Sequence, residues 1–95
     1  MSFEIKTIEV FDRQAKRLAK HYASFKQDYK DFLDELRKNP LTGTDLGGGV
    51  RKVRMAIASK GKGKSGGARV ITYTADVITT SLEEELLLLS IYDKV

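Results

Sequence analysis

The sequence predicts an α+β fold in which an antiparallel sheet of about four strands is covered on one face by an N-terminal helical hairpin. Two observations predict it. Apolar residues recur at helical spacing through residues 11–36, and they alternate with polar residues in the second half of the chain. The expected order is β-α-α-β-β-β, within a single domain that spans residues 1–95.

Two stripes of apolar residues predict the helices. They are Phe11, Ala15, Leu18 and Tyr22 in the first helix, and Phe25, Tyr29, Phe32 and Leu36 in the second. The first helix is expected to begin near Phe11 with Asp12 as its N-cap, and a capping box of Ser24 and Gln27 is expected to open the second. Asn39-Pro40 ends the second helix, because proline cannot donate the next amide. A connection this short predicts an antiparallel helical hairpin.

Alternation of apolar and polar residues predicts the strands. Phe3 and Ile5 indicate a short first strand, and residues 41–49 are expected to form a glycine-rich connection. The stretch from Val50 to Tyr73 is then expected to form two strands joined by a loop of glycine and lysine.

The first strand of this hairpin has two distinct faces. They consist of Val53, Met55 and Ile57 on one side, and of Lys52, Arg54 and Ala56 on the other. The second strand is expected to run from about Ala68 to Val77. Within it, Arg69 shares a face with Ile71 and Tyr73, which resemble core residues. Either the strand end is frayed at the arginine, or a bulge changes the phase.

The last strand, LLLLSIY, follows an acidic turn at residues 81–85 and is apolar on both faces, so a central position is expected. Its two faces are predicted to be Leu87, Leu89 and Ile91 on one side, and Ser90, Tyr92 and Lys94 on the other. The open face of the sheet would then carry the polar residues Lys52, Arg54, Ser90, Tyr92 and Lys94.

Positive charge is concentrated in one stretch. Between Val50 and Tyr73 lie seven of the 17 Lys and Arg residues and none of the 13 Asp and Glu residues. The seven are Arg51, Lys52, Arg54, Lys60, Lys62, Lys64 and Arg69. A basic patch on an otherwise slightly acidic chain favours an anionic partner such as nucleic acid. The alternative is a solvated basic loop that binds nothing.

Several classes of site are disfavoured by composition. The chain has no cysteine and one histidine, His21, which is expected on the surface; neither a disulfide nor a common zinc site is expected. Gly63-Lys64-Ser65 imitates a P-loop, but Ala58 stands where the motif needs glycine. Residues 83–85, three glutamates, are expected to be a solvated turn. No signal peptide or membrane-spanning run is present, so a cytoplasmic protein without membrane partners is expected.

Cations and a tyrosine on one sheet face can act on RNA without a metal. Lysine and arginine neutralise charge that develops on a pentacovalent phosphate, and a further group moves the proton. RNA supplies its own nucleophile, the 2′-hydroxyl next to the scissile phosphate.

The chain resembles the RelE/ParE toxin superfamily, in particular the HigB/RelE-like toxins of bacterial type II toxin–antitoxin systems. The resemblance covers nearly all of the sequence, and its most specific part is KGKGKSGGARVI at residues 60–71. It is also carried by GVRKVR at residues 49–54, LSIYDK at residues 89–94, LAKHY at residues 18–22 and NPLTG at residues 39–43.

This resemblance implies a ribosome-dependent mRNA endoribonuclease without metal or other cofactor, which leaves a 2′,3′-cyclic phosphate and a 5′-hydroxyl. Its partners would be the ribosome, mRNA and a cognate antitoxin, expected to be a small helix-turn-helix protein. Lys52 and Arg54 match the paired basic residues of the family's second strand. Arg69 matches an arginine that contacts the phosphate in the transition state, and Lys94 a basic residue after the fourth strand. The RNA- and ribosome-binding residues are expected to be Arg51, Lys60, Lys62 and Lys64.

Many relatives continue into a C-terminal helix that can supply a general acid or base. We expect this helix to be absent here, which leaves Tyr92 and Lys94 as the local candidates. Two alternatives therefore stay open: a catalytically inactive module that binds RNA or ribosome and antitoxin, and a ParE-like gyrase inhibitor.

Overall fold

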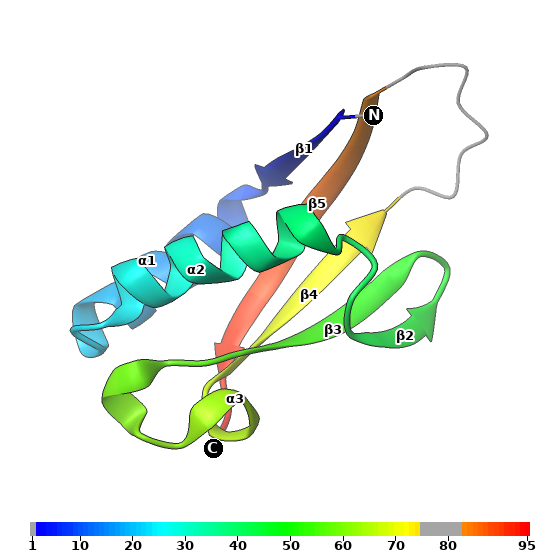
Figure 1. Ribbon diagram of the computed structural model, residues 1–95. Helices are drawn as coiled ribbons and strands as arrows, with labels where there is room; N and C mark the ends of the chain where they lie inside the picture. The colour runs from blue at the N-terminus through cyan, green and yellow to red at the C-terminus, as the bar shows by residue number, and fades with distance from the viewer. Residues whose placement is uncertain (1, 75–82) are drawn as a thin grey trace.

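A computed structural model describes residues 2–74 and 83–95 of the chain (Figure 1). The strands are β1 (Ser2–Thr7), β2 (Thr44–Gly47), β3 (Val50–Met55), β4 (Ala68–Thr74) and β5 (Glu83–Asp93). The helices are α1 (Glu9–His21), α2 (Phe25–Lys38), the 3-10 turn η1 (Ala58–Lys60) and the single turn α3 (Gly63–Gly66). The predicted α+β class, with an N-terminal helical hairpin followed by strands, is confirmed.

The sheet is mixed and has five strands in the order β1-β5-β4-β3-β2. The antiparallel part runs from β5 to β2, whereas β1 pairs parallel with β5 at the edge. The fifth strand is β2, which lies within the stretch that the sequence predicted as a plain connection. Gly47 pairs with Val50, and the two residues between them, Gly48 and Gly49 at φ of 62° and 85°, supply the positive φ angles needed for a tight turn into β3.

Helix α1 begins earlier than predicted, whereas α2 begins at Phe25 with Ser24 as its N-cap, as predicted. Helix α1 begins at Glu9 with Ile8 as its N-cap, so Asp12 lies in the first turn. The predicted capping box does not form at α2, because Ser24 already has helical angles of φ −82° and ψ −5°. Its hydroxyl donates to Asp28 instead, at 2.6 Å, and Gln27 donates to Asp31.

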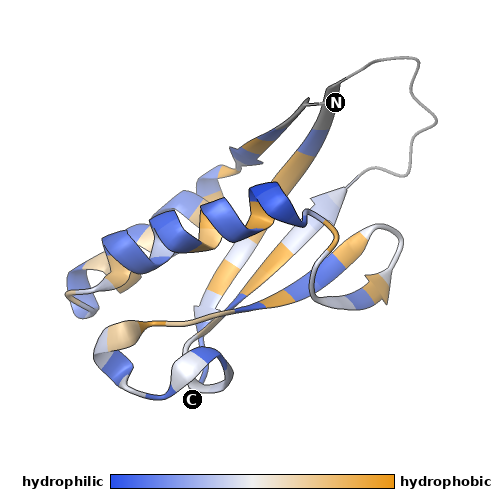
Figure 2. Ribbon diagram, viewed as in Figure 1, coloured by the Kyte–Doolittle hydropathy of each residue, from blue (hydrophilic) through white to orange (hydrophobic). Residues whose placement is uncertain are grey.

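One hydrophobic core fills the space between the helical hairpin and one face of the sheet. From the helices come the buried residues Phe11, Leu18, Phe25, Phe32 and Leu36, which confirms both predicted stripes. The predicted inner face of β3 is also confirmed, since Val53, Met55 and the following Ile57 are all buried. Figure 2 shows the alternation of apolar and polar residues along β3, and the hydrophilic outer surface of α2.

The predicted phase of β4 is wrong, and that of β5 is wrong for its leucines but right for Ile91 and Tyr92. In β4, Val70 and Thr72 are buried against the helices, while Ile71 and Tyr73 lie half-buried on the opposite face with Arg69. Arg69 therefore needs no bulge of its own. Residues 75–77, predicted to continue this strand, lie outside the described ranges.

A bulge in the pairing of β4 with β5 changes the phase of β5. Ile71 pairs with Ser90 and Thr72 with Leu88, which leaves Leu89 as the extra residue. The core residues of β5 are consequently Leu86, Leu88 and Ile91 instead of the predicted Leu87, Leu89 and Ile91. The interior position of β5, between β1 and β4, is confirmed. Of the predicted acidic turn, residues 83–85 belong to β5, and residues 81–82 lie outside the described ranges.

Candidate nucleic-acid interface

Three of the predicted site residues form a row on the sheet face opposite the helices. Arg69 on β4 is paired with Arg54 on β3 and with Tyr92 on β5. Side chains directly opposite each other on neighbouring strands share a face, with Cβ atoms about 5 Å apart. Lys52 lies on the same face, two residues along β3 from Arg54. Residues that are up to 40 positions apart in the sequence are thus brought together on the sheet face opposite α1 and α2.

The row differs in exposure along its length. Arg54 is exposed and Tyr92 is 43% exposed, whereas Arg69 is only 9% exposed. Two arginines directly opposite each other repel. The guanidinium of Arg69 turns away from Arg54 and donates to backbone carbonyls of Lys64 at 3.3 Å, Ser65 at 2.9 Å and Ala68 at 3.2 Å. A phosphate contact by Arg69 would require some of these bonds to be exchanged.

We predict that Arg69→Ala loosens the loop that α3 belongs to. The substitution removes the donors of two loop carbonyls, and hydrogen bonds to a charged donor contribute about 1.5–3 kcal/mol each at most. Hydrogen exchange of the amides at residues 64–67 should accelerate, and Arg69→Lys should restore only part of the protection because lysine lacks the planar fork. Unchanged exchange in the alanine variant would show that Arg69 does not hold the loop.

Lys60 is the most enclosed of the loop lysines, with a side chain that is 10% exposed. Its ammonium donates to the carboxylate of Asp93 and to the backbone carbonyls of Lys94 at 2.9 Å and Gly67 at 3.2 Å. The ring centroid of Tyr22 lies 5.6 Å away. These contacts hold the loop against the end of β5. Lys60, which the sequence predicted to bind RNA, is therefore enclosed and has little exposed surface.

Asp93 is the residue around which these contacts form, and no pattern in the sequence indicated it. Besides Lys60, the hydroxyl of Tyr22 donates to its carboxylate at 2.5 Å. The hydrogen bonds from Lys60 and then from Tyr22 hold the pKa of Asp93 below its usual value, and the same bond raises the pKa of Tyr22. Tyr22 and Asp93 are 71 residues apart, so no local motif could have revealed the pair.

The other cations predicted to bind RNA are placed as follows. Lys62 is exposed, and Lys64 forms an exposed ion pair with Glu35 at 3.2 Å. Lys94 is exposed just beyond β5. Arg51 lies on the helix side of the sheet and donates to the hydroxyl of Thr74 at 3.0 Å, so it does not share the face of Arg54.

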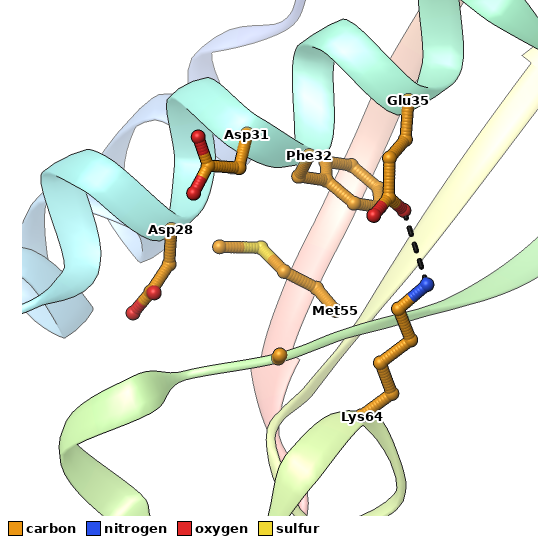
Figure 3. A pocket seen from close by; sticks show the side chains of 7 residues that line it. Asp28, Asp31, Phe32, Glu35, Met55 and Lys64 are labelled. Carbon is orange, nitrogen blue, oxygen red and sulfur yellow. Dashed lines mark hydrogen bonds and ion pairs between the residues drawn. The ribbon is translucent and has the colours of Figure 1, made fainter.

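A cleft of about 150 Å³ lies between α2 and the end of β3, on the helix side (Figure 3). Phe32 and Met55 line its apolar part, and three carboxylates from α2 lie around it, at Asp28, Asp31 and Glu35. Glu35 points to Lys64 of α3, and Asp28 accepts the backbone amide of Ala58 at 3.0 Å. These acids would repel a phosphate, so the cleft holds the loop in place and is not the nucleic-acid interface.

Ser90, which the sequence predicted on the open face, donates its hydroxyl to Gln14 of α1 at 3.0 Å. Its hydroxyl is therefore hydrogen-bonded to a helix. His21 is exposed, as predicted.

Comparison with known families does not identify the chain, because no protein-family model matches it. Within the described ranges, no group of three or more His, Cys, Asp or Glu side chains is arranged to hold a metal ion. No helix in this part of the chain is long and apolar enough to cross a membrane.

Proposed function

We propose that the protein is a toxin of the RelE/HigB type that cleaves mRNA on the ribosome. The observation that supports this most directly is the row of Arg54, Arg69 and Tyr92 on the sheet face opposite α1 and α2, in which Arg54 and Tyr92 are exposed. The row combines exposed positive charge with an exposed aromatic hydroxyl, which is a combination suited to a single RNA strand.

The proposed reaction is an attack of the RNA 2′-hydroxyl on the adjacent phosphorus atom, with loss of the 5′-oxygen. The products are a 2′,3′-cyclic phosphate and a 5′-hydroxyl. Arg54 and Lys52 neutralise the charge that develops on the phosphoryl oxygens. In the proposed reaction Tyr92, which is in line with Arg54 across the sheet, exchanges a proton with the attacking or leaving oxygen. Lys94, just beyond the strand, is a second candidate for this role.

The proposal includes the partners and the compartment of such toxins. The ribosome would supply the mRNA in its decoding site, and a cognate antitoxin would bind the toxin and block it. Both would be met in the cytoplasm.

The proposal is tested by inducing the protein in cells and mapping new mRNA 5′ ends on translating ribosomes. Cuts at defined positions within codons are expected. The matched control is a variant in which Arg54 and Tyr92 are replaced by alanine and phenylalanine. An absence of cuts would remove the endoribonuclease function, and trapped gyrase–DNA complexes with a DNA-damage response would point to a ParE-like toxin instead.

A catalytically inactive binding module is the second candidate, and one contact favours it. The guanidinium of Arg69 donates to the backbone carbonyls of Lys64, Ser65 and Ala68 at 2.9–3.3 Å, and the residue is only 9% exposed. Such a module would bind ribosome and antitoxin with the same affinity as an enzyme. The two are separated by activity, since only the enzyme produces RNA with cyclic phosphate ends.

The two exposed lysines of the loop should contribute to the binding of a single RNA strand, with Lys64 exchanging its weak, exposed ion pair with Glu35 for a phosphate contact. We predict that the double change Lys62→Ala and Lys64→Ala lowers the slope of log K against log salt by about 1.4, because each lost phosphate contact removes about 0.7. The double change Lys30→Ala and Lys38→Ala on α2 removes the same charge from exposed positions and should leave the slope unchanged. Equal slopes for both variants would show that the loop touches no phosphate.

A further inference from the structure

A second cationic surface lies on α1, away from the stretch between β3 and β4. Its exposed residues Arg13, Lys16, Arg17 and Lys20 face solvent, and no acidic residue occurs between Arg13 and Gln27. None of the four takes part in an ion pair with another described residue. We call these four residues the α1 strip.

The α1 strip is electrostatically unfavourable within the folded protein alone. Arg13 and Arg17, like Lys16 and Lys20, are four residues apart, and like charges at this spacing repel on a helix surface. Only Lys20 of the four lies in the last turn of α1, so the helix dipole offsets little of the repulsion. Charges left uncompensated in this way are available to an anionic partner.

The strip adjoins the strand that carries Tyr92. Beyond the end of β1, the edge of β5 is covered by α1, where the amide oxygen of Gln14 accepts the backbone amide of Ile91 at 2.9 Å. A shallow hollow of about 470 Å³ separates the helix from the strand end, and it is lined by Arg17, Leu18, Lys20, His21 and Asp93. Because Asp93 is already bonded to Lys60 and Tyr22, its charge does not cancel that of the strip.

We propose that the α1 strip binds the phosphate backbone of double-helical RNA while the open face of the sheet holds a single strand. This rests on the proposed function and adds a second RNA contact to it. Cations one turn apart on a rigid helix provide point contacts to successive phosphates. Single strands are instead bound by aromatic stacking. Among the described residues, no Phe, Tyr or Trp lines the hollow beside the strip, whereas the open face exposes Tyr92.

The test compares two double variants in the binding of a fluorescent RNA duplex of about 16 base pairs. Arg17→Ala with Lys20→Ala removes two charges of the strip, and Lys30→Ala with Lys38→Ala removes two from exposed positions of α2. Alanine is the best helix former, so both variants keep their helices. Anisotropy titrations between about 50 and 200 mM salt give the slope of log K against log salt.

We expect the α1 variant to lower this slope by about 1.8, which corresponds to two lost phosphate contacts, and the α2 variant to keep the wild-type slope. Equal effects of the two variants, or an unchanged slope in the α1 variant, would overturn the proposal. Failure of the proposed function is a separate outcome, because loss of duplex binding in the α1 variant supports the strip whether or not the wild-type protein cleaves RNA.

Discussion

Replacement of Arg54 by alanine should lower the rate of RNA cleavage by about 10²–10³-fold, the usual cost of removing one donor that stabilises developing charge. Arg54 is exposed on the open face, in register with Arg69 and, beyond it, with Tyr92. Arg54→Lys should retain part of the rate, because lysine keeps the charge but loses the planar fork. Single-turnover cleavage on programmed ribosomes measures the effect.

The fold should tolerate this replacement. Arg54 points away from the core, and its removal relieves the repulsion from Arg69 on the neighbouring strand. The midpoint of thermal unfolding is therefore expected not to fall. Arg37→Ala, at an exposed position on α2, is the matched control and should cleave at the wild-type rate. A wild-type rate in Arg54→Ala would show that the open face is not the catalytic surface.

The replacement Lys60→Met should cost about 2–3 kcal/mol of unfolding free energy, a value between those of exposed and fully buried ion pairs. The methionine fills a similar volume but leaves the carbonyls of Gly67 and Lys94 without their donor and Asp93 without its cation. Denaturant titration measures the loss. Lys62→Met, two residues away on the exposed side of the same loop, should stay within about 0.5 kcal/mol of wild type.

The ion pair of Lys60 and Asp93 should make the free energy of unfolding depend on pH. The pKa of Asp93 is lower in the folded protein than in the unfolded chain, so its contribution is present above the unfolded value of about 3.9. It is lost as the pH falls below that value toward the folded pKa. Wild-type stability should therefore fall more steeply than that of Lys60→Met below about pH 4. Parallel curves for the two proteins would contradict the assignment of Lys60 to Asp93.

The helices and the inner face of β3 could be predicted because their patterns are local. Spacing alone predicts the buried face of the helix that carries Phe11 and Leu18, and that of the strand that carries Val53 and Met55. The phase of β5 could not be predicted in this way. Leu86 to Leu89 are all apolar and show no alternation, and the bulge at Leu89 is a property of the pairing with β4. The parallel pairing of β1 with β5 likewise depends on contacts between the two ends of the chain.

The candidate site was predictable to a similar extent. The shared face of Lys52 and Arg54 follows from alternation, and their alignment with Tyr92 follows once the strands are paired. The orientation of Arg69 and the burial of Lys60 depend on carbonyls in the loop and on a carboxylate 33 residues away. Spacing in the sequence carries no information about such contacts.

The proposed mechanism is cleavage of RNA by attack of the RNA's own 2′-hydroxyl on the adjacent phosphate. It is tested most directly by programming ribosomes with an mRNA that has a single 2′-deoxynucleotide on the 5′ side of a mapped cut, and by analysing the ends produced. The proposed mechanism predicts that the unmodified mRNA ends in a 2′,3′-cyclic phosphate, and that no cut occurs at the deoxy position. A chelator that leaves the ribosome intact should not reduce the cleavage. Cleavage at the deoxy position, or a 3′-hydroxyl end on the unmodified mRNA, would contradict it.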